Sequence, residues 1–97
     1  MSMHNPPHPG EFINEIYMKP FELSSRKVSA NLNVSHSTLT RLIRGDSSIT
    51  PEMALRLSTV FGRSPESWLT MQDNYSLWIA KQNIDLSSVK KLELTIA

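Results

Sequence analysis

Residues 23–45 read LSSRKVSANLNVSHSTLTRLIRG, and this stretch decides the fold because it holds two helix starts close together. Either Ser24 or Ser25 can cap a first short helix with its hydroxyl group. Asn33 then falls where that helix ends, a position that favours a left-handed backbone, which Asn tolerates. Ser35 follows as the N-cap of a second helix. The sequence therefore predicts two short helices joined by a tight turn, a helix-turn-helix.

The second helix of this motif, expected at residues 35–44 and closed by Gly45, has two distinct faces. One face is apolar and is expected to pack against the rest of the protein: Leu39, Leu42 and Ile43. The opposite face is polar: Ser37, Arg41 and Arg44, with Thr38 and Thr40 at its edges. An arginine can donate two hydrogen bonds to guanine, and hydroxyl groups bond to bases or phosphates. The polar face therefore suits the major groove of DNA.

Further helical patterns lie on both sides of the motif. One begins at Pro9 and is stopped by Pro20. Another begins at Thr50, with a proline in its first turn, and ends at Gly62. A fifth begins with the same signal at Ser64 and carries a wide apolar and aromatic stripe. Because short turns join these five helices, the sequence predicts a compact all-α domain.

The chain is expected to have three parts: a flexible leader at residues 1–8, a helix-turn-helix domain at residues 9–80 with its motif at 24–45, and a tail at residues 81–97. Two prolines in the leader suit an extended chain. In the tail, apolar and polar residues alternate, which fits either a short extended edge strand or disordered chain: Leu92, Leu94 and Ile96.

Charge is distributed unevenly along the chain. The formal net charge is only +1, which by itself argues weakly against a nucleic-acid partner. Residues 19–44, however, carry +4, while residues 1–18 and 45–80 each carry −2. A basic segment between acidic flanks suits one-sided contact with a polyanion.

Several classes of protein are disfavoured by composition. There is no cysteine, so disulfides, thiolate zinc sites and thiol nucleophiles are excluded. The prolines between His4 and His8 prevent a helical metal site, and we expect no metal, cofactor or small-molecule ligand. No catalytic arrangement of side chains is evident, so an enzyme is not expected. Apolar runs are too short to span a membrane, and we expect a cytoplasmic protein.

Residues 23–45 resemble the helix-turn-helix of the phage-repressor-like (Cro/C1, or XRE) family, whose fold is lambda repressor-like. Other stretches resemble the HigA antitoxin subfamily, also called VapI-like: His8-Pro9-Gly10-Glu11, residues 48–57, Ser64-Pro65-Glu66, Trp68-Leu69, Gln72, Tyr75 and Trp78. The resemblance covers roughly residues 8–80. Three positions depart from the family's usual residues: Asn33 for Gly, Ser29 for Ala and Ser67 for an aromatic residue. Ser25 stands where many repressors have the longer Gln.

The resemblance implies DNA contacts for two sets of residues. Those expected near the bases are Ser35, Ser37, Thr38 and Arg41. Those expected near the phosphates are Ser24, Arg26, Lys27 and Arg44. His36 adjoins the turn, and contact with phosphate and an incidental exposed position remain equal alternatives for it. Phosphate contacts supply affinity, and base contacts supply the choice of sequence.

The stripe on the fifth helix has two interpretations, core packing or a subunit contact: Trp68, Met71, Tyr75 and Trp78. Its area favours a homodimer, because two recognition helices discriminate a palindromic operator better than one. The resemblance further implies that the protein neutralises a HigB-like, mRNA-cleaving toxin and represses its own operon. Two alternatives stay open: a stand-alone XRE-family regulator without a toxin, and a helical protein-interaction module that does not bind DNA.

Overall fold

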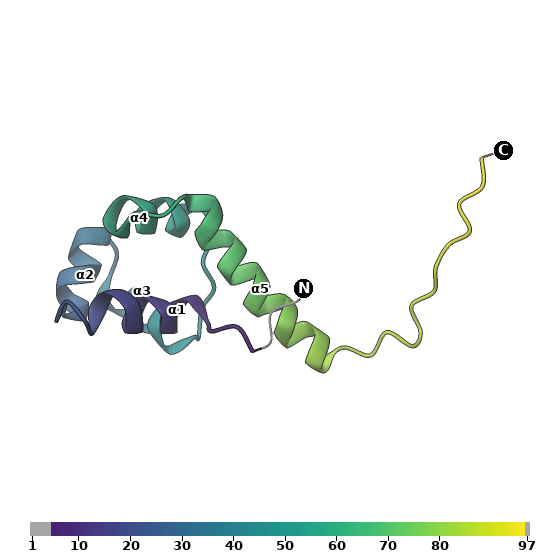
Figure 1. Cartoon of the computed structure of the whole chain (residues 1–97), viewed down its shortest axis with the longest axis horizontal. Coiled ribbons are helices and arrows are strands. Elements are labelled where there is room, and N and C mark those ends of the chain that lie inside the picture. The colour runs from purple at the N-terminus through teal and green to yellow at the C-terminus, as the bar shows by residue number, and fades with distance from the viewer. Residues whose placement is uncertain (1–4, 97) are drawn as a thin grey trace.

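The computed structural model describes residues 5–96, and every regular element among them is a helix (Figure 1). In chain order these elements are α1 (Pro9–Phe12), the π-helical η1 (Ile13–Met18), α2 (Ser25–Leu32), α3 (His36–Arg44), α4 (Pro51–Phe61) and α5 (Pro65–Asn83). The all-α prediction with five α-helices is confirmed, and the tail expected from residue 81 begins only after Asn83.

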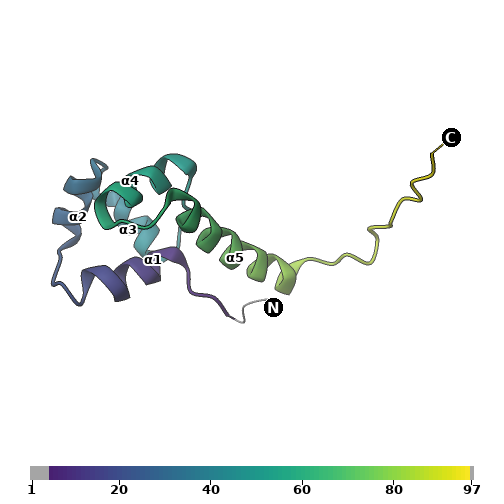
Figure 2. The same cartoon turned by 45° about the horizontal axis from the view of Figure 1, so that its top comes forward.

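The elements form a head from which one helix projects. The head consists of α1 to α4 and the first half of α5, and the second half of α5 leads the chain away from it in both views (Figures 1 and 2). Residues 84–96 continue outward as extended chain without a strand. The molecule therefore measures 59 × 27 × 25 Å. No helix within residues 5–96 is long and apolar enough to cross a membrane.

Side-chain hydroxyl groups cap four helices, as the sequence predicts. Ser24 rather than Ser25 caps α2, Ser35 caps α3, and Thr50 and Ser64 cap α4 and α5. Each hydroxyl oxygen accepts a hydrogen bond from the backbone N–H three residues later. Such caps satisfy backbone donors that have no partner inside the helix.

The core of the head is built around Trp68, which has no exposed surface. It belongs to one cluster with buried side chains from η1, α2, α3, α4 and the loop before α4: Ile13, Met18, Val28, Leu32, Leu39, Leu42, Ile49, Ala54 and Leu57. The Trp68 indole N–H donates to the carbonyl of Gly62 at 3.2 Å. The prediction of a subunit contact is therefore wrong for Trp68, because a side chain without exposed surface has none to offer a partner.

The first predicted helix winds differently from an ordinary α-helix. Its second half, η1, is a π-helix, and the N–H of Lys19 bonds to the carbonyl of Asn14 at 2.9 Å. A bond between residues five apart brings such residues to nearly the same face. Ile13 and Met18, five apart, are both buried. The winding thus follows from two core residues at a spacing that an α-helix does not place on one side.

The start of the domain is packed more tightly than the expected leader. His8 is buried, and its Nδ1 accepts a hydrogen bond from the N–H of Gly10, which caps α1. A Cβ added at Gly10 would lie 1.8 Å from the carbonyl oxygen of Leu42, so only glycine lets α1 cross α3 at this distance. His8 and the buried Pro6 therefore belong to the head, and Met1 to His4 lie outside the described residues.

Candidate nucleic-acid interface

A tight turn connects the two motif helices, and left-handed backbone conformations end both of them. Asn33 adopts a left-handed conformation, with φ 56° and ψ 48°, and ends α2. Gly45, with φ 84°, ends α3 in the same way. Leu39 and Leu42 are buried on the inner side of α3, which leaves its other side to solvent. The helix-turn-helix predicted from residues 23–45 is therefore present.

Three of the residues expected near DNA bases form one hydroxyl cluster at the start of α3. The Ser35 Oγ lies 2.7 Å from the Thr38 Oγ1 and 3.2 Å from the Ser37 Oγ. Ser35 and Ser37 are exposed, and Thr38 is half-buried. These hydroxyl groups are held in place by one another and by the cap of the helix. They present hydrogen-bonding groups at the end of α3 that leads into a groove in such motifs.

Arg41 lies one helical turn beyond this cluster on the same face of α3. Its side chain is exposed, as is that of Arg44 near the end of the helix. In the part of the chain that the structure describes, neither guanidinium takes part in an ion pair. Their donors are therefore available to an outside acceptor, and the guanidinium geometry fits guanine and phosphate.

The residues expected near phosphates lie on two helices. Arg26 and Lys27 are exposed in the first turn of α2, and Ser24 caps that helix. Arg44 is the last residue of α3, at the end opposite to the hydroxyl cluster. The Ser24 oxygen is already engaged by the N–H of Lys27 at 3.1 Å. No hydrogen bond within residues 5–96 joins these four side chains to the hydroxyl cluster, so they form a separate, peripheral set.

One contact between the two motif helices was not anticipated. The Ser25 Oγ and the His36 Nε2 form a hydrogen bond of 2.7 Å that joins the first turn of α2 to the first turn of α3. His36 is exposed and Ser25 is half-buried. The bond fixes the start of the second helix relative to the first. The only signal in the sequence was the short Ser25 side chain at the start of the first motif helix.

Arg56, on α4, is a second residue that was not anticipated, and it contacts the turn between the two motif helices. Its guanidinium donates to the carbonyls of Leu32 at 2.9 Å and Asn33 at 3.2 Å, and it also pairs with Glu52 at 2.8 Å. These carbonyls lie at the end of α2, where the helix dipole favours a positive charge. Arg56 is thus a positioning residue, and its place on α4 gave no indication of this role in the sequence.

The end of α3 is tied to the start of the domain by His8. The His8 Nε2–H donates to the carbonyl of Ser47 at 3.0 Å, and the ring packs edge-on to Tyr75 with centroids 4.9 Å apart. Because Nδ1 accepts from Gly10, the neutral imidazole carries its proton on Nε2. Burial lowers the pKa of His8, against the opposing effects of the Ser47 carbonyl and the nearby carboxylates.

The rest of the predicted subunit contact lies along α5. Met71, Tyr75 and Trp78 are half-buried, and Leu77 is 56% exposed. Unlike Trp68, these side chains retain surface that a second molecule can cover. Met71 lies in the first half of α5, and Tyr75, Leu77 and Trp78 lie in the second half, which projects from the head (Figure 2).

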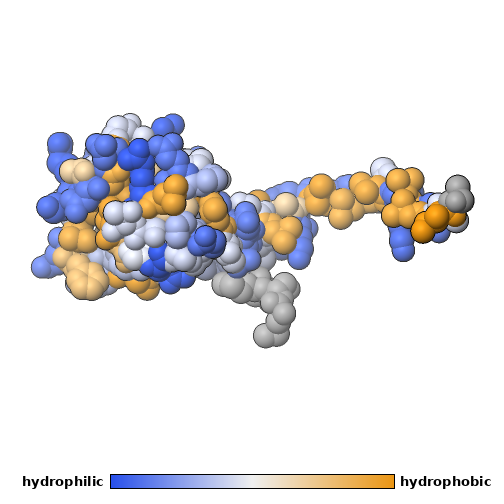
Figure 3. All heavy atoms as spheres, turned by 90° about the horizontal axis from the view of Figure 1, so that it is seen from above, coloured by the Kyte–Doolittle hydropathy of each residue, from blue (hydrophilic) through white to orange (hydrophobic). Residues whose placement is uncertain are grey.

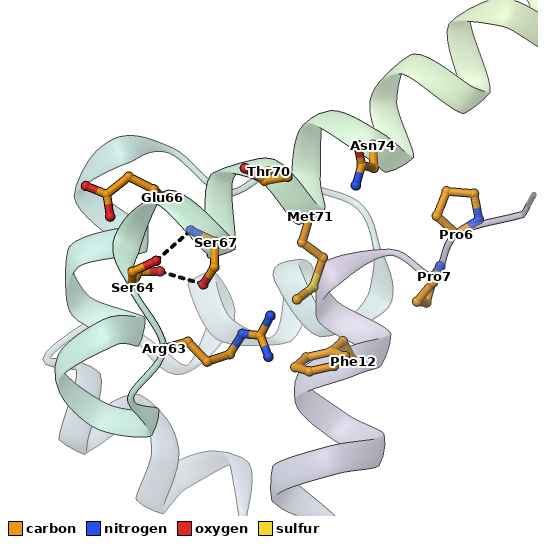
Figure 4. A pocket seen from close by; sticks show the side chains of 10 residues that line it. All are labelled: Pro6, Pro7, Phe12, Arg63, Ser64, Glu66, Ser67, Thr70, Met71 and Asn74. Atoms are coloured by element: carbon orange, nitrogen blue, oxygen red, sulfur yellow. Dashed lines mark hydrogen bonds between the residues drawn. The ribbon is translucent and has the colours of Figure 1, made fainter. Parts of the chain in front are cut away.

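A pocket of about 550 Å³ lies between the chain before α1 and the first half of α5 (Figure 4). Its apolar lining comes from Pro6, Pro7, Phe12 and Met71. The Arg63 guanidinium lies 5.1 Å from the centre of the Phe12 ring. Arg63 holds a left-handed backbone, with φ 64°, and the Ser58 hydroxyl donates to its carbonyl at 2.8 Å. No cluster of potential metal ligands occurs among the described residues.

Comparison with known proteins places this geometry in a family. Residues 15–68, more than half of the chain, match the family described as "Helix-turn-helix". The HTH-type transcriptional regulator YddM of Escherichia coli K12 is 38% identical over 92 residues, covering 95% of this chain and 97% of YddM. The solved antitoxin GraA superposes with a TM-score of 0.87 at 31% identity, over 93% of this chain and 100% of GraA.

A further solved structure contains DNA. It is the Pseudomonas aeruginosa antitoxin HigA with the higBA promoter, which superposes with a TM-score of 0.80 at 29% identity, over 93% of this chain and 100% of that one. The recognition of a phage-repressor-like fold is thereby confirmed. The chain belongs to the helix-turn-helix family of DNA-binding transcriptional regulators that includes the HigA-type antitoxins, which is not a class of enzymes.

Proposed function

We propose that the protein is a dimeric antitoxin that represses its own operon by binding a palindromic operator. The observation that carries this proposal is the outer face of α3, where the exposed Ser37 and Arg41 side chains share one side of a capped helix. Arg41 reads a guanine with its two parallel donors, and the hydroxyl cluster of Ser35, Ser37 and Thr38 contacts bases at the leading end.

The peripheral set supplies affinity rather than sequence choice. Arg26, Lys27 and Arg44 carry positive charge beside the reading face, and Ser24 lies at the start of α2. Neutralising phosphates releases counterions, so binding through these residues weakens as salt rises. The small net charge of +1 leaves little attraction for DNA of any sequence, which favours binding only where the base contacts also form.

The test compares Arg41→Ala with Lys27→Ala on the promoter DNA of the protein's own gene. Arg41→Ala should lower the discrimination between operator and scrambled DNA by about 1–3 kcal/mol. Lys27→Ala should weaken binding to both DNAs alike and reduce the salt slope by about one. Fluorescence anisotropy over a salt series measures both quantities. Unchanged specificity in Arg41→Ala would rule out the reading role of α3.

The toxin partner is the second part of the proposal. Its support is the similarity to antitoxins along nearly the whole chain, including GraA at 31% identity. We infer that a toxin with mRNA-cleaving activity of the HigB type is neutralised by direct binding. Expression of the neighbouring gene alone and together with this chain tests the inference, since growth arrest should appear only without this chain. A stand-alone regulator, the alternative, gives no arrest in either case.

A further inference from the structure

The tail after α5 carries more apolar surface than any other exposed segment of the described chain. Six aliphatic side chains within it are more than half exposed: Ile84, Leu86, Val89, Leu92, Leu94 and Ile96. Figure 3 shows the segment that extends beyond the head as largely hydrophobic. Contiguous apolar surface of this kind marks a site of interaction, because water disfavours it. The tail therefore needs a complementary surface.

The pocket at the start of α5 has the complementary chemistry. Phe12 and Met71 form its apolar floor, the Arg63 guanidinium lies beside the Phe12 ring, and Glu66 lies at the far edge of the pocket (Figure 4). Neither charge takes part in an ion pair among residues 5–96. The pocket thus combines an apolar floor with two charges of opposite sign, and the positive one also lies over the Phe12 and Trp68 rings.

The end of the tail carries a complementary pattern. In an extended chain successive side chains point to opposite sides, so Leu92 and Leu94 share one side while Lys91 and Glu93 share the other. With the leucines facing Phe12 and Met71, the two charged side chains start from the outer side of the inserted chain and turn back toward the edge of the pocket. There we pair Glu93 with Arg63 and Lys91 with Glu66, both of which are exposed.

The position of the tail favours the pocket of another molecule over its own. The pocket lies beside the first turns of α5, and the tail leaves the other end of that helix, roughly 28 Å away for 19 residues. After α5 a turn directs the chain outward, with the Ser87 N–H bonded to the Asp85 Oδ1 at 2.9 Å and the Val89 N–H to the Leu86 carbonyl at 3.0 Å. Figure 1 shows the tail leading away from the head.

A two-fold dimer removes this separation. If two α5 helices pack antiparallel through the face that carries Tyr75 and Trp78, one turn apart, the end of each helix lies beside the start of the other. Each tail then begins next to the pocket of the other molecule. Eight residues, 84–91, can span up to about 26 Å of extended chain before Leu92 reaches the pocket.

We propose that residues 91–96 of one copy insert into the Phe12–Met71 pocket of a second copy, with Glu93 opposite Arg63, so that each chain straps the other. This inference rests on the homodimer that we proposed as part of the function. It adds which segment and which pocket hold the two copies together. The strap joins the two heads, and so it sets the distance between the two α3 helices that an operator must match.

Cysteine cross-linking tests the proposal, because the chain has no cysteine of its own. Thr70→Cys lines the pocket, and Leu94→Cys marks the strap. Mixing the two single variants under mild oxidation should give a disulfide-linked heterodimer on a non-reducing gel. Thr59→Cys, exposed on α4 away from the pocket, is the matched control and should give no more than background with Leu94→Cys.

Three results overturn the proposal. A double variant with Thr70→Cys and Leu94→Cys that oxidises to a cross-linked monomer shows that the tail fills its own pocket. Leu94→Cys alone cross-linking faster than the mixture shows that the tails pair with each other. A mixture without heterodimer shows that the pocket does not take the tail.

Sedimentation separates the strap from the dimer itself. A wild-type chain that is monomeric at every concentration refutes both the dimer of the proposed function and the strap, whereas a dimer without cross-linking refutes only the strap. Glu93→Lys should raise the dimer dissociation constant by about two- to 30-fold, as expected when two symmetry-related exposed ion pairs are lost. Adding Arg63→Glu should restore it, and a lack of restoration contradicts the pairing of these two residues.

Discussion

The two ends of the described chain are opposites in composition and in packing. The N-terminal end, Pro6 to Gly10, contains prolines, a histidine and a glycine, and it is largely buried against α3 and α5. The C-terminal end is rich in leucine and isoleucine, and it is exposed throughout. Hydrophobicity alone would assign these roles the other way round. Specific hydrogen bonds and close backbone approach, rather than apolar content, decide which end is bound to the head.

Gly10→Ala is the strongest way to break the packed end. Its Cβ would collide with the backbone of Leu42 and Ile43, which cannot rotate away as a side chain can. We expect a loss of about 3 kcal/mol or more in the free energy of unfolding, at or above the upper range for an overpacked core. Urea unfolding followed by circular dichroism measures it.

A matched control is Gly62→Ala, because a Cβ at Gly62 meets no atom within 4 Å. Its φ of 85° leaves only backbone strain, which costs about 1–3 kcal/mol. Equal losses in the two variants would show that Gly10 is not selected by the close approach of α1 to α3.

Two variants of His8, in the packed N-terminal end, separate its cap on Gly10 from its hydrogen bond to Ser47. His8→Ala loses both the cap on Gly10 and the bond to Ser47, and we expect it to cost about 2 kcal/mol. His8→Asn keeps a capping oxygen but does not reach Ser47, so its cost should be about half as large. The free energy of unfolding of each variant gives the comparison. If His8→Asn is as unstable as His8→Ala, the cap contributes nothing.

Acid should loosen the packed end through the same residue. Burial holds the pKa of His8 below its ordinary value of 6.5, so the unfolded chain takes up this proton first. The contribution of His8 to stability is therefore complete above about pH 6.5 and declines as the pH falls toward the lower pKa of the folded state. Protonation places a hydrogen on Nδ1 and breaks the bond from Gly10.

The measurement is the difference in unfolding free energy between the wild type and His8→Asn across pH 5 to 8. Taking the difference removes the contribution of carboxylates that titrate in both proteins. We expect the advantage of the wild type to shrink on the acidic side of this interval. A constant difference would mean that His8 has the same pKa in the folded and unfolded chains.

The features that the sequence predicts correctly are those that depend on residues close together in the chain. The serine caps of α2 and α3 and the left-handed Asn33 depend on neighbours within one turn. Ser35 and Asn33 are found as expected, and of the two candidates for the α2 cap the structure has Ser24. Ser29 also bonds back to the carbonyl of Arg26 at 3.1 Å, as its departure from alanine suggests. Features of this kind can be derived residue by residue.

Contacts between distant segments could not be derived in this way. Ser25 meets His36 across 11 positions, Arg56 reaches Leu32 across 24, and His8 reaches Ser47 across 39. Each depends on how whole helices cross. The stripe on α5 shows the same limit, because its pattern does not reveal where the head stops covering it. Trp68 is buried because the head covers that part of α5, while Leu77, further along the same helix, is exposed.

Leu86→Ala should have the smallest effect and sharpens the comparison from the exposed end. Leu86 is 58% exposed and lies in the tail before the proposed strap, so removing its side chain opens no cavity. We expect less than about 0.5 kcal/mol in the free energy of unfolding, measured at a protein concentration where the chain is monomeric. Leu42→Ala, the same substitution at 1% exposure, is the matched control and should cost about 2–5 kcal/mol. A large loss in Leu86→Ala would mean that the tail packs on its own head, and the contrast between the two ends would then disappear.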